Sequence, residues 1–352
     1  MKSPLIEKLL QQPVGWLADS GPDEDIAISS RIRLARNLAN RPFPVHATDE
    51  ELAAVADSII TAADGMSEPP WLRFDINELD NTDRMILFER RLVSRELFKR
   101  PAGAHLLMSP DEQNGIMVNE EDHIRLQSLL PGFQLAEAYE QIDRVDCILA
   151  EKLDIAYDDK LGFLTSCPTN LGTAMRASVM LHLPALVLEN RISGAVQGIG
   201  QLGLTVRGIF GEGSDNRGNL FQISNQSTLG ESEPEIIDRL GRVIAKLIEH
   251  EKNARQRLLE NKANFLFDRI GRAYGCLRNA YILSAGEALN ALSMLRLGVD
   301  LKMFETVSIH TVNNLFVRIN PAHLAKLAPA APNPRELDVV RATLVRAMLR
   351  EK

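Results

Sequence analysis

The most informative stretch of the chain is Cys167-Pro168-Thr169-Asn170-Leu171-Gly172-Thr173, which is followed closely by Arg176. It places a thiol, a rigid turn, a glycine and an arginine within ten residues. The apolar run after it, residues 174–181, predicts the start of a helix. A thiol just before a helix is favoured as a thiolate, because unpaired N–H groups and the helix dipole lie nearby. The alternative is a small buried cysteine in a turn.

The size and composition of the chain limit the classes of protein to consider. Its 352 residues exceed what one hydrophobic core usually serves, so we expect two domains. The net charge of −7 argues against binding nucleic acid through bulk charge. Three widely spaced cysteines give neither a disulfide framework nor a zinc pattern, which suits a reducing compartment. There is no signal-like N-terminus and no apolar run of about 18 residues, so we expect a cytoplasmic protein without a membrane span.

The order of the predicted elements indicates an α+β fold followed by helices. Helical patterns cover residues 1–20, 48–63, 81–98 and 143–156, and strand patterns cover residues 26–33, 104–108, 115–119, 133–135, 162–165, 204–210 and 220–224. From Ser232 onward the pattern is helical, with expected N-caps at Ser232, Ser284 and Asn333. We therefore expect a catalytic domain over residues 1–255 and a helical domain over residues 256–352.

Three further motifs combine charged side chains in a way that suggests a site. Residues 119–125 (NEEDHIR) contain three acids, and the alternative is a solvated acidic helix start. Residues 207–213 (RGIFGEG) hold Arg207 and Glu212, and the alternative is a hairpin with chance charges. Arg31 and Arg33 alternate on one strand and so share a face. Their forked guanidinium groups suit phosphate oxygens, and the alternative is a basic strand edge.

A nucleotide site in this chain has to be built without the common glycine-rich loops. Residues 198–203 match G-x-G-x-x-G, but they follow a helical run and precede a strand, which is the reverse of the dinucleotide-binding context. The chain has no Walker motif and no protein-kinase motif set. Arginines are the remaining candidates for holding phosphates. His123 is expected to be structural or exposed rather than catalytic.

Together and in this order, the motifs resemble those of the phosphagen (guanidino) kinases over residues 20–250. The resemblance is carried by C-P-T-N-L-G-T at Cys167, N-E-E-D-H-x-R at Asn119, R-G-x-x-G-E at Arg207 and S-N-Q-x-T-L-G at Ser224. Within that family the whole chain is similar to the bacterial protein-arginine kinase branch. The helical domain that the metabolite kinases carry ahead of S-x-R-x-R is expected to be missing, and a helical C-terminal region is present instead.

The resemblance implies the guanidino-kinase fold, an antiparallel sheet flanked by helices, and it implies roles for the motif residues. Five arginines should bind the ATP phosphates: Arg31, Arg33, Arg125, Arg176 and Arg207. Glu121 and Glu212 should hold the acceptor guanidinium, with Cys167 beside it. One carboxylate can accept the proton as the N–P bond forms, and we take Glu121 as this base and Glu212 as the clamp. Mg²⁺ should ride mainly on the nucleotide, without a protein metal site.

Two departures from the family pattern concern nucleotide binding and regulation. The family carries a histidine on the adenine side of the nucleotide, and Arg91 occupies that position in this chain. Arginine can also stack on a base. Members of the protein-arginine kinase branch carry R-D-x-x-R-A in the last helix, which is understood as an allosteric phosphoarginine pocket. Here Asp338 and Arg341 match that motif, but Leu337 replaces its first arginine.

The main hypothesis is ATP-dependent phosphorylation of arginine side chains in proteins. The resemblance implies exposed arginines of a transcriptional repressor among the substrates, a zinc-binding activator, a Clp-type ATPase and protease, and a homodimer formed through residues 256–352. It also implies a link to the stress response. Two alternatives stay open: a kinase of free arginine or another small guanidino metabolite, and a phosphoarginine-binding adaptor with little catalysis.

Overall fold

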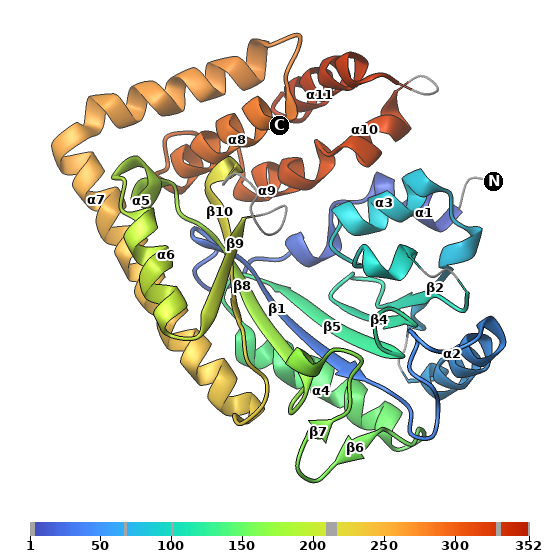
Figure 1. Cartoon of the computed structure of the whole chain (residues 1–352). Coiled ribbons are helices and arrows are strands. Elements are labelled where there is room, and N and C mark those ends of the chain that lie inside the picture. Colours follow the sequence, from blue (N-terminus) through green and yellow to red (C-terminus); the bar gives the residue numbers. More distant parts are fainter. Residues whose placement is uncertain (1–3, 67–68, 100–101, 209–216, 329–331, 351–352) are drawn as a thin grey trace. The chain divides into compact units, whose positions relative to one another are not determined.

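The computed structural model describes residues 4–66, 69–99, 102–208, 217–328 and 332–350 (Figure 1). The helices in this part of the chain are α1 (Pro4–Gln11), α2 (Asp49–Ala63), α3 (Asn81–Glu89), α4 (Leu135–Ala150), α5 (Pro184–Leu188), α6 (Ile192–Gln201), α7 (Glu233–Asn279), α8 (Ala285–Asp300), α9 (Ile309–Arg318), α10 (Pro321–Leu327) and α11 (Pro334–Met348). The strands are β1 (Ala27–Arg36), β2 (Leu72–Asp75), β3 (His105–Met108), β4 (Asn114–Val118), β5 (Ile124–Pro131), β6 (Tyr157–Asp158), β7 (Gly162–Phe163), β8 (Met175–His182), β9 (Leu204–Gly208) and β10 (Leu220–Asn225).

A large sheet organises the fold. Within the described residues it has eight strands in the order β2-β3-β4-β5-β1-β8-β10-β9. The pairs β2/β3, β3/β4, β4/β5 and β5/β1 are antiparallel, and every residue of β5 is buried. Helix α4 packs against β5 and α2 packs against α4. The expected α+β fold is confirmed, with an antiparallel sheet flanked by helices and a helical C-terminal region.

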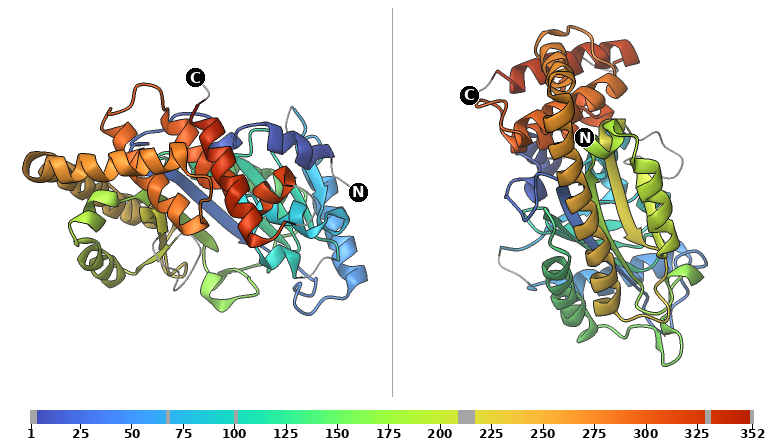
Figure 2. Two further views of the ribbon diagram at one scale, coloured as in Figure 1. Left: turned by 90° about the horizontal axis from the view of Figure 1, so that it is seen from above. Right: turned by 90° about the vertical axis from the view of Figure 1, so that its left-hand side faces the viewer.

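The chain divides into two compact units that each contain several segments. The first comprises residues 1–21, 29–179 and 224–242, and the second comprises residues 22–28, 180–223 and 243–352. Helix α7 is long and has one non-helical residue, Lys262 (φ −142°), where the helix bends (Figures 1 and 2). The division of the chain at residue 255 stays a prediction.

Several predicted elements are confirmed because local chemistry fixes them. Thr48 caps α2, with its hydroxyl accepting from the N–H of Glu51 and the Glu51 carboxylate accepting from the N–H of Thr48. The expected caps of α8 and α11 are also present, at Ser284 and Asn333. At the start of α7, the Glu235 carboxylate accepts from the N–H of Ser232 at 2.8 Å. These caps satisfy N–H groups that have no partner within their helix.

Other sequence predictions were wrong, and each error has a physical cause. Residues 174–181, expected as a helix, lie almost entirely in β8 (Met175–His182), because a run that is apolar on both faces looks alike in a buried strand and a helix. Strand β5 was missed, since Arg125 and Gln127 break its apolar pattern. The strand expected over residues 133–135 is absent, and α4 begins at Leu135 and ends before residue 156. The helix expected over residues 81–98 ends at Glu89, because Arg91 has a φ of +64°.

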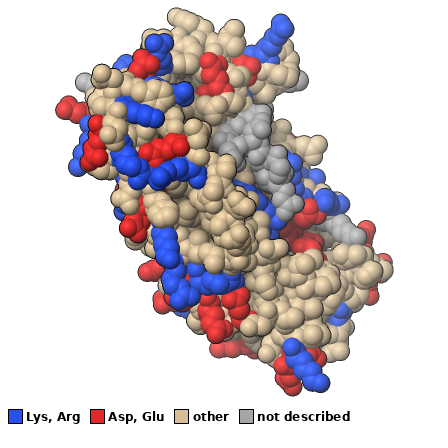
Figure 3. Space-filling view, turned by 60° about the vertical axis from the view of Figure 1, so that its left-hand side comes forward, with Lys and Arg blue, Asp and Glu red and all other residues tan. Residues whose placement is uncertain are grey.

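The outer surface of the described residues carries both signs of charge. On the face in Figure 3, Lys and Arg side chains are interspersed with Asp and Glu side chains. Among the described helices, none is long and apolar enough to cross a bilayer.

The second unit contains a buried polar network centred on Arg296 of α8. This fully buried guanidinium donates to Asn313 Oδ1 at 2.9 Å and to the carbonyl of Asp25 at 3.1 Å, and it lies 3.1 Å from His182 Nδ1. Burial, and then the charge of Arg296, lowers the pKa of His182 well below its usual value, so the ring is neutral and its Nδ1 can accept. The network joins the end of β8 to α8 and α9.

Replacing Arg296 with methionine should therefore destabilise the fold. Removing one partner from a buried charged network costs about 3–5 kcal/mol, because the remaining polar groups lose their partners. Denaturant unfolding measures this loss directly. Arg335→Met is the matched control, because Arg335 is exposed at the start of α11, and it should change the unfolding free energy far less. Equal effects of the two substitutions would contradict the assignment.

Candidate active site

Three of the predicted phosphate-binding arginines meet on one face of the first unit's sheet. In the β1/β5 register, Arg33 lies opposite Gln127 and Ala35 lies opposite Arg125. Residues directly opposite each other in an antiparallel pair point to the same side, and alternate residues of a strand share a side. Arg31, Arg33 and Arg125 therefore share one face.

The electrostatics of this face show that its positive charges lie close together. Burial, and then the charges of Arg91, Arg176 and Arg125, lowers the pKa of Arg31 to about 9. Burial and the neighbouring guanidinium groups also lower the pKa of Arg33 well below its usual value. Such shifts arise where like charges are crowded with little solvent between them. An anion bound among them would remove the repulsion.

Two buried donors point to a ligand at this face. Arg33 Nε and Arg125 Nε are buried and have no hydrogen-bond partner among the described residues. Buried donors are nearly always paired, so orphaned ones indicate a site for a missing acceptor. Guanidinium groups bind phosphate oxygens in forked, charge-assisted hydrogen bonds. The residues present therefore fit the polyphosphate of a nucleotide.

The remaining predicted arginines lie in different parts of the chain. Arg176 is on β8 in the first unit, and its Nη2 donates to Ser224 Oγ at 3.2 Å. Its charge lowers the pKa of Arg31 and Arg33, so it belongs to the same cluster. Arg207 is on β9 in the second unit. Glu212 lies outside the described residues.

The turn that carries Glu121 is fixed by a buried aspartate. Asp122 is fully buried, and its Oδ1 accepts from Asn37 Nδ2 and from the N–H of Ser166, both at 2.7 Å. The first bond ties the turn to the end of β1, and the second ties it to the residue before Cys167. Glu121 and Cys167, which are far apart in the sequence, are therefore the neighbours of two directly bonded residues.

His123 is structural, as expected. It is fully buried; Nδ1 accepts from the N–H of Leu38 at 3.1 Å, and Nε2 lies 3.1 Å from the carbonyl of Pro42. Burial lowers the pKa of this imidazole, which favours the neutral ring with the proton on Nε2. Both ring nitrogens are used to hold the segment that follows β1.

The S-N-Q-S-T-L-G motif at residues 224–230 holds the loop around Cys167 through hydrogen bonds of Thr228. Thr228 Oγ1 bonds to the carbonyls of Thr169 at 3.0 Å and Leu171 at 2.6 Å, and the N–H of Thr173 donates to the carbonyl of Thr228. Cys167 itself is half-buried, with its Sγ 3.0 Å from Thr169 Oγ1. It directly precedes a short 3₁₀ helix (Pro168–Asn170) rather than the α-helix expected from the sequence.

The carboxyl group of Glu121 has the character that a proton acceptor needs. Burial, and then the charge of Asp122, raises its pKa, although Arg125 acts in the opposite direction. A raised pKa brings the carboxylate nearer to the working pH and makes it a stronger base. Its neighbour Glu120 behaves differently. Burial would raise the pKa of Glu120, but Arg125 and a hydrogen bond from Ser94 outweigh burial and lower it.

The C-terminal motif residues Asp338 and Arg341 are brought together in α11. Arg341 is buried and hydrogen-bonds to the Asp338 carboxylate, to the carbonyl of Leu283 at 2.8 Å and to the carbonyl of Ile319 at 3.0 Å. These contacts connect α11 to the turns before α8 and after α9. A phosphoarginine pocket at this place stays a prediction.

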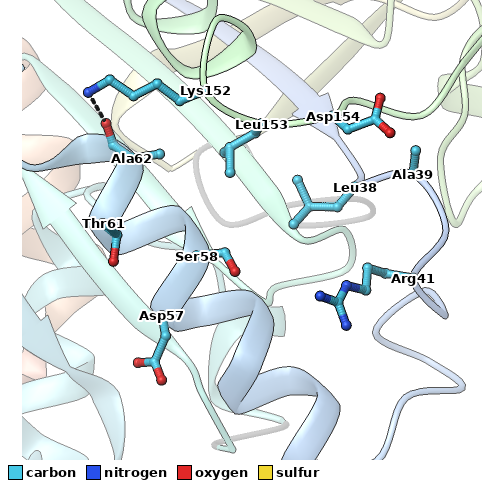
Figure 4. A pocket seen from close by; sticks show the side chains of 10 residues that line it. All are labelled: Leu38, Ala39, Arg41, Asp57, Ser58, Thr61, Ala62, Lys152, Leu153 and Asp154. Atoms are coloured by element: carbon cyan, nitrogen blue, oxygen red, sulfur yellow. Dashed lines mark hydrogen bonds between the residues drawn. The ribbon is translucent and has the colours of Figure 1, made fainter.

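An open pocket of about 630 Å³ lies elsewhere in the first unit (Figure 4). Its walls are the end of α2, the segment after β1 and the segment after α4. Lys152 at its rim donates to the carbonyl of Ala62 at 2.7 Å. Its charged lining is mixed, with Arg41 and Lys152 beside Asp57 and Asp154, and it includes none of the clustered arginines. We assign it no ligand.

Comparisons with known proteins identify relatives of this chain. A family model described as "ATP:guanido phosphotransferase, C-terminal catalytic domain" matches residues 59–254, and one described as "Protein-arginine kinase McsB C-terminal domain" matches residues 263–352. A Halothermothrix orenii protein named "Protein-arginine kinase" is 44% identical over 334 residues, 95% of this chain and 96% of that protein.

The chain belongs to the ATP:guanido phosphotransferase family.

Other members of the family support the assignment. A Bacillus subtilis (strain 168) protein, also named "Protein-arginine kinase", is 43% identical over 337 residues, 95% of this chain and 93% of that protein. The crystal structure of lombricine kinase has a TM-score of 0.58 and 26% identity, and the match covers 69% of this chain and 70% of that one. The resemblance seen in the sequence is confirmed. Membership makes the chain a phosphotransferase.

Sequence reasoning missed three residues that build the site. Asp122 and Asn37 were not singled out, although Asp122 lies inside the N-E-E-D-H motif. Thr228 lies inside S-N-Q-S-T-L-G, a motif that the sequence marked without a role. Asp122 and Thr228 could have been found in the sequence, because they are polar residues of quoted motifs to which no chemical role had been assigned.

Gly172 should be irreplaceable in the loop of Cys167. Its φ is +94°, and an added Cβ would lie 2.2 Å from the carbonyl oxygen of Thr228. Gly172→Ala should therefore displace the loop and lower kcat by about tenfold or more, since small misplacements at a reacting centre are costly. Steady-state kinetics with a melting curve tests this. Gly194→Ala on α6 is the control, because nothing lies within 4 Å of its added Cβ; equal kinetics for both variants would contradict the role of Gly172.

Proposed function

We propose that this chain transfers the γ-phosphoryl group of ATP to the guanidinium of arginine side chains in proteins. The observation that carries the proposal is a crowded arginine face with orphaned donors. In the same unit, the hydrogen bond from the N–H of Ser166 to Asp122 joins the turn that carries Glu121 to the loop that carries Cys167. The names of the relatives, which match over nearly the full length, supply the acceptor class. The match of the C-terminal segment to the McsB C-terminal model favours proteins over free metabolites as substrates.

The arrangement accounts for the chemistry of transfer. A guanidinium is protonated near neutrality and is a poor nucleophile, so it must lose a proton as it attacks. A guanidinium nitrogen forms a bond to the γ-phosphorus while the bond from that phosphorus to the bridging oxygen breaks, and ADP leaves. Glu121 accepts the nitrogen's proton, and we assign Glu212 and Cys167 to hold the cationic acceptor.

The arginine face contributes by offsetting charge on the transferring group. Phosphoryl transfer needs little covalent help from the protein, and most of the catalysis comes from positioning and electrostatics. We assign phosphate binding to five arginines: Arg31, Arg33, Arg125, Arg176 and Arg207. Mg²⁺ bound with the nucleotide supplies further positive charge to the phosphates.

The finer biological setting rests on the family resemblance alone. We propose cytoplasmic action as a homodimer on a transcriptional repressor and on proteins destined for a Clp-type protease, with a zinc-binding activator, as part of a stress response. Asp338 and Arg341 are proposed as the remnant of an allosteric phosphoarginine pocket that has Leu337 in place of an arginine.

The acceptor class is tested by incubating the protein with ATP and Mg²⁺ in the presence of either a partly unfolded protein or free arginine. We expect phosphoarginine in the protein, detected by mass spectrometry under mild, non-acidic conditions. Product on free arginine alone would assign the chain to metabolite phosphorylation instead. Biological output that survives both Glu121→Ala and Cys167→Ala would instead favour an adaptor.

Glu121→Gln should lower kcat by about 100-fold or more, which is the usual contribution of a positioned general base. The wild-type rate should fall as the pH drops through the raised pKa of Glu121, because protonation removes the base. This acid limb should therefore lie above the range of an ordinary glutamate, and the variant's profile should lack it. Glu89→Gln is the control, since Glu89 ends α3 outside the site motifs. An acid limb that persists in Glu121→Gln would remove Glu121 from the role.

A further inference from the structure

Gln127 fixes a sixth arginine over the phosphate-binding face. It is buried and lies directly opposite Arg33 in the β1/β5 register, so its side chain shares the face of Arg31, Arg33 and Arg125. Gln127 Nε2 donates to the carbonyl oxygen of Arg91 at 2.9 Å. The main chain of Arg91 is therefore held over the same face by the side chain that lies opposite Arg33.

The backbone of Arg91 is itself unusual. Its φ of +64° lies in the left-handed region, which arginine seldom adopts, and its N–H donates to the carbonyl of Phe88 at 2.9 Å. Such a conformation persists where the surroundings determine it, and it is concentrated at functional sites. Here the residue before it is also fixed, because Arg90 is buried in an ion pair with Glu112. The turn after α3 thus holds the main chain of Arg91 in one defined conformation.

The charge of Arg91 acts on the cluster. Burial lowers the pKa of Arg91 to about 10. Among the charges that lower the pKa of Arg31, that of Arg91 has the largest effect. An adenine ring stacked on Arg91 would leave this repulsion in place, because the ring has no net charge. A phosphate oxygen between the two guanidinium groups would remove it.

We propose that Arg91 binds the triphosphate of the nucleotide together with the arginines of β1, β5 and β8, and that Gln127 is the positioning residue that holds it there. The inference rests on the proposed function, in which this face binds ATP. It assigns Arg91 to the phosphates instead of the adenine side that the family pattern implies.

The test uses inorganic tripolyphosphate with Mg²⁺, a probe that has the phosphates and lacks the base. Its affinity for the full-length protein is measured by calorimetry and by competition against ATP. Arg91→Met should weaken tripolyphosphate binding by about tenfold or more, as expected for one charge-assisted contact, and Arg91→Lys should restore most of the loss. Arg95→Met is the matched control, because Arg95 is exposed on the same segment, and it should bind as the wild type does.

An unchanged tripolyphosphate affinity in Arg91→Met, together with weakened binding of adenosine, would overturn the proposal and return Arg91 to the base. Loss of affinity in Arg91→Lys equal to that in Arg91→Met would also contradict it. Because the assay needs no protein acceptor, it separates this inference from the proposed function: a protein that binds tripolyphosphate through Arg91 but forms no phosphoarginine refutes only the latter.

The role of Gln127 has its own readout. Gln127→Leu keeps the size of the side chain but removes its donor, so it should weaken tripolyphosphate binding and raise the KM for ATP more than it lowers kcat. If Gln127 acts through Arg91, the double variant with Arg91→Met should be no weaker than Arg91→Met alone. Additive losses in the double variant would show that Gln127 acts independently, and would contradict the positioning role.

Discussion

The site depends on the buried carboxylate of Asp122. One oxygen accepts from Asn37 at the end of β1 and from the main chain of Ser166, both at 2.7 Å. Each hydrogen bond to a charged group contributes about 1.5–3 kcal/mol when the group is buried. The two bonds hold three separate chain segments to one point. Asn37 joins the same segments a second time, because its Oδ1 accepts from the N–H of His123 at 2.9 Å and its Nδ2 donates to the carbonyl of Leu164 at 3.0 Å.

The arginine face illustrates how a fold can hold charge that it does not neutralise. Glu120 is the acid whose charge raises the pKa of Arg33, and it is outweighed by the surrounding guanidinium groups. The strands force the side chains together, because alternation on β1 and pairing with β5 leave them no other direction. The rigidity of the sheet therefore sustains a repulsion that an unfolded chain would relax. A polyanion gains affinity from that stored repulsion, since its binding removes it.

The sequence predicted the motifs of the site better than their geometry. Arg31 and Arg33 were placed correctly on one strand, because strict alternation is a local property. Strand β8 was expected as a helix, since a run buried on both faces carries no period that distinguishes the two. The bond between Asp122 and Ser166 joins residues 44 positions apart, and the bond to Asn37 joins residues 85 apart. Such contacts depend on strand order, which no local pattern contains.

The side-chain role of Arg91 was beyond sequence reasoning for a similar reason. The sequence placed Arg91 within an expected helix and assigned it to the adenine side, whereas the amide of Gln127 on β5 holds its main chain over the arginine face. Helix α3 ends at Glu89 because the chain turns there, and the left-handed backbone of Arg91 is part of that turn. Local propensity favoured a longer helix, and tertiary contacts prevailed.

The two hydrogen bonds of the His123 ring affect which groups near the site can respond to a change in pH. A ring whose two nitrogens are both committed to main-chain groups has no free position for exchange with solvent, although it stands only two residues from Glu121. Imidazole is the side chain that usually titrates near neutrality. Here the ring holds the segment after β1 in place, and the group at this centre whose pKa is raised toward neutrality is the Glu121 carboxyl. Acid strong enough to charge this ring would break its hold and release that segment.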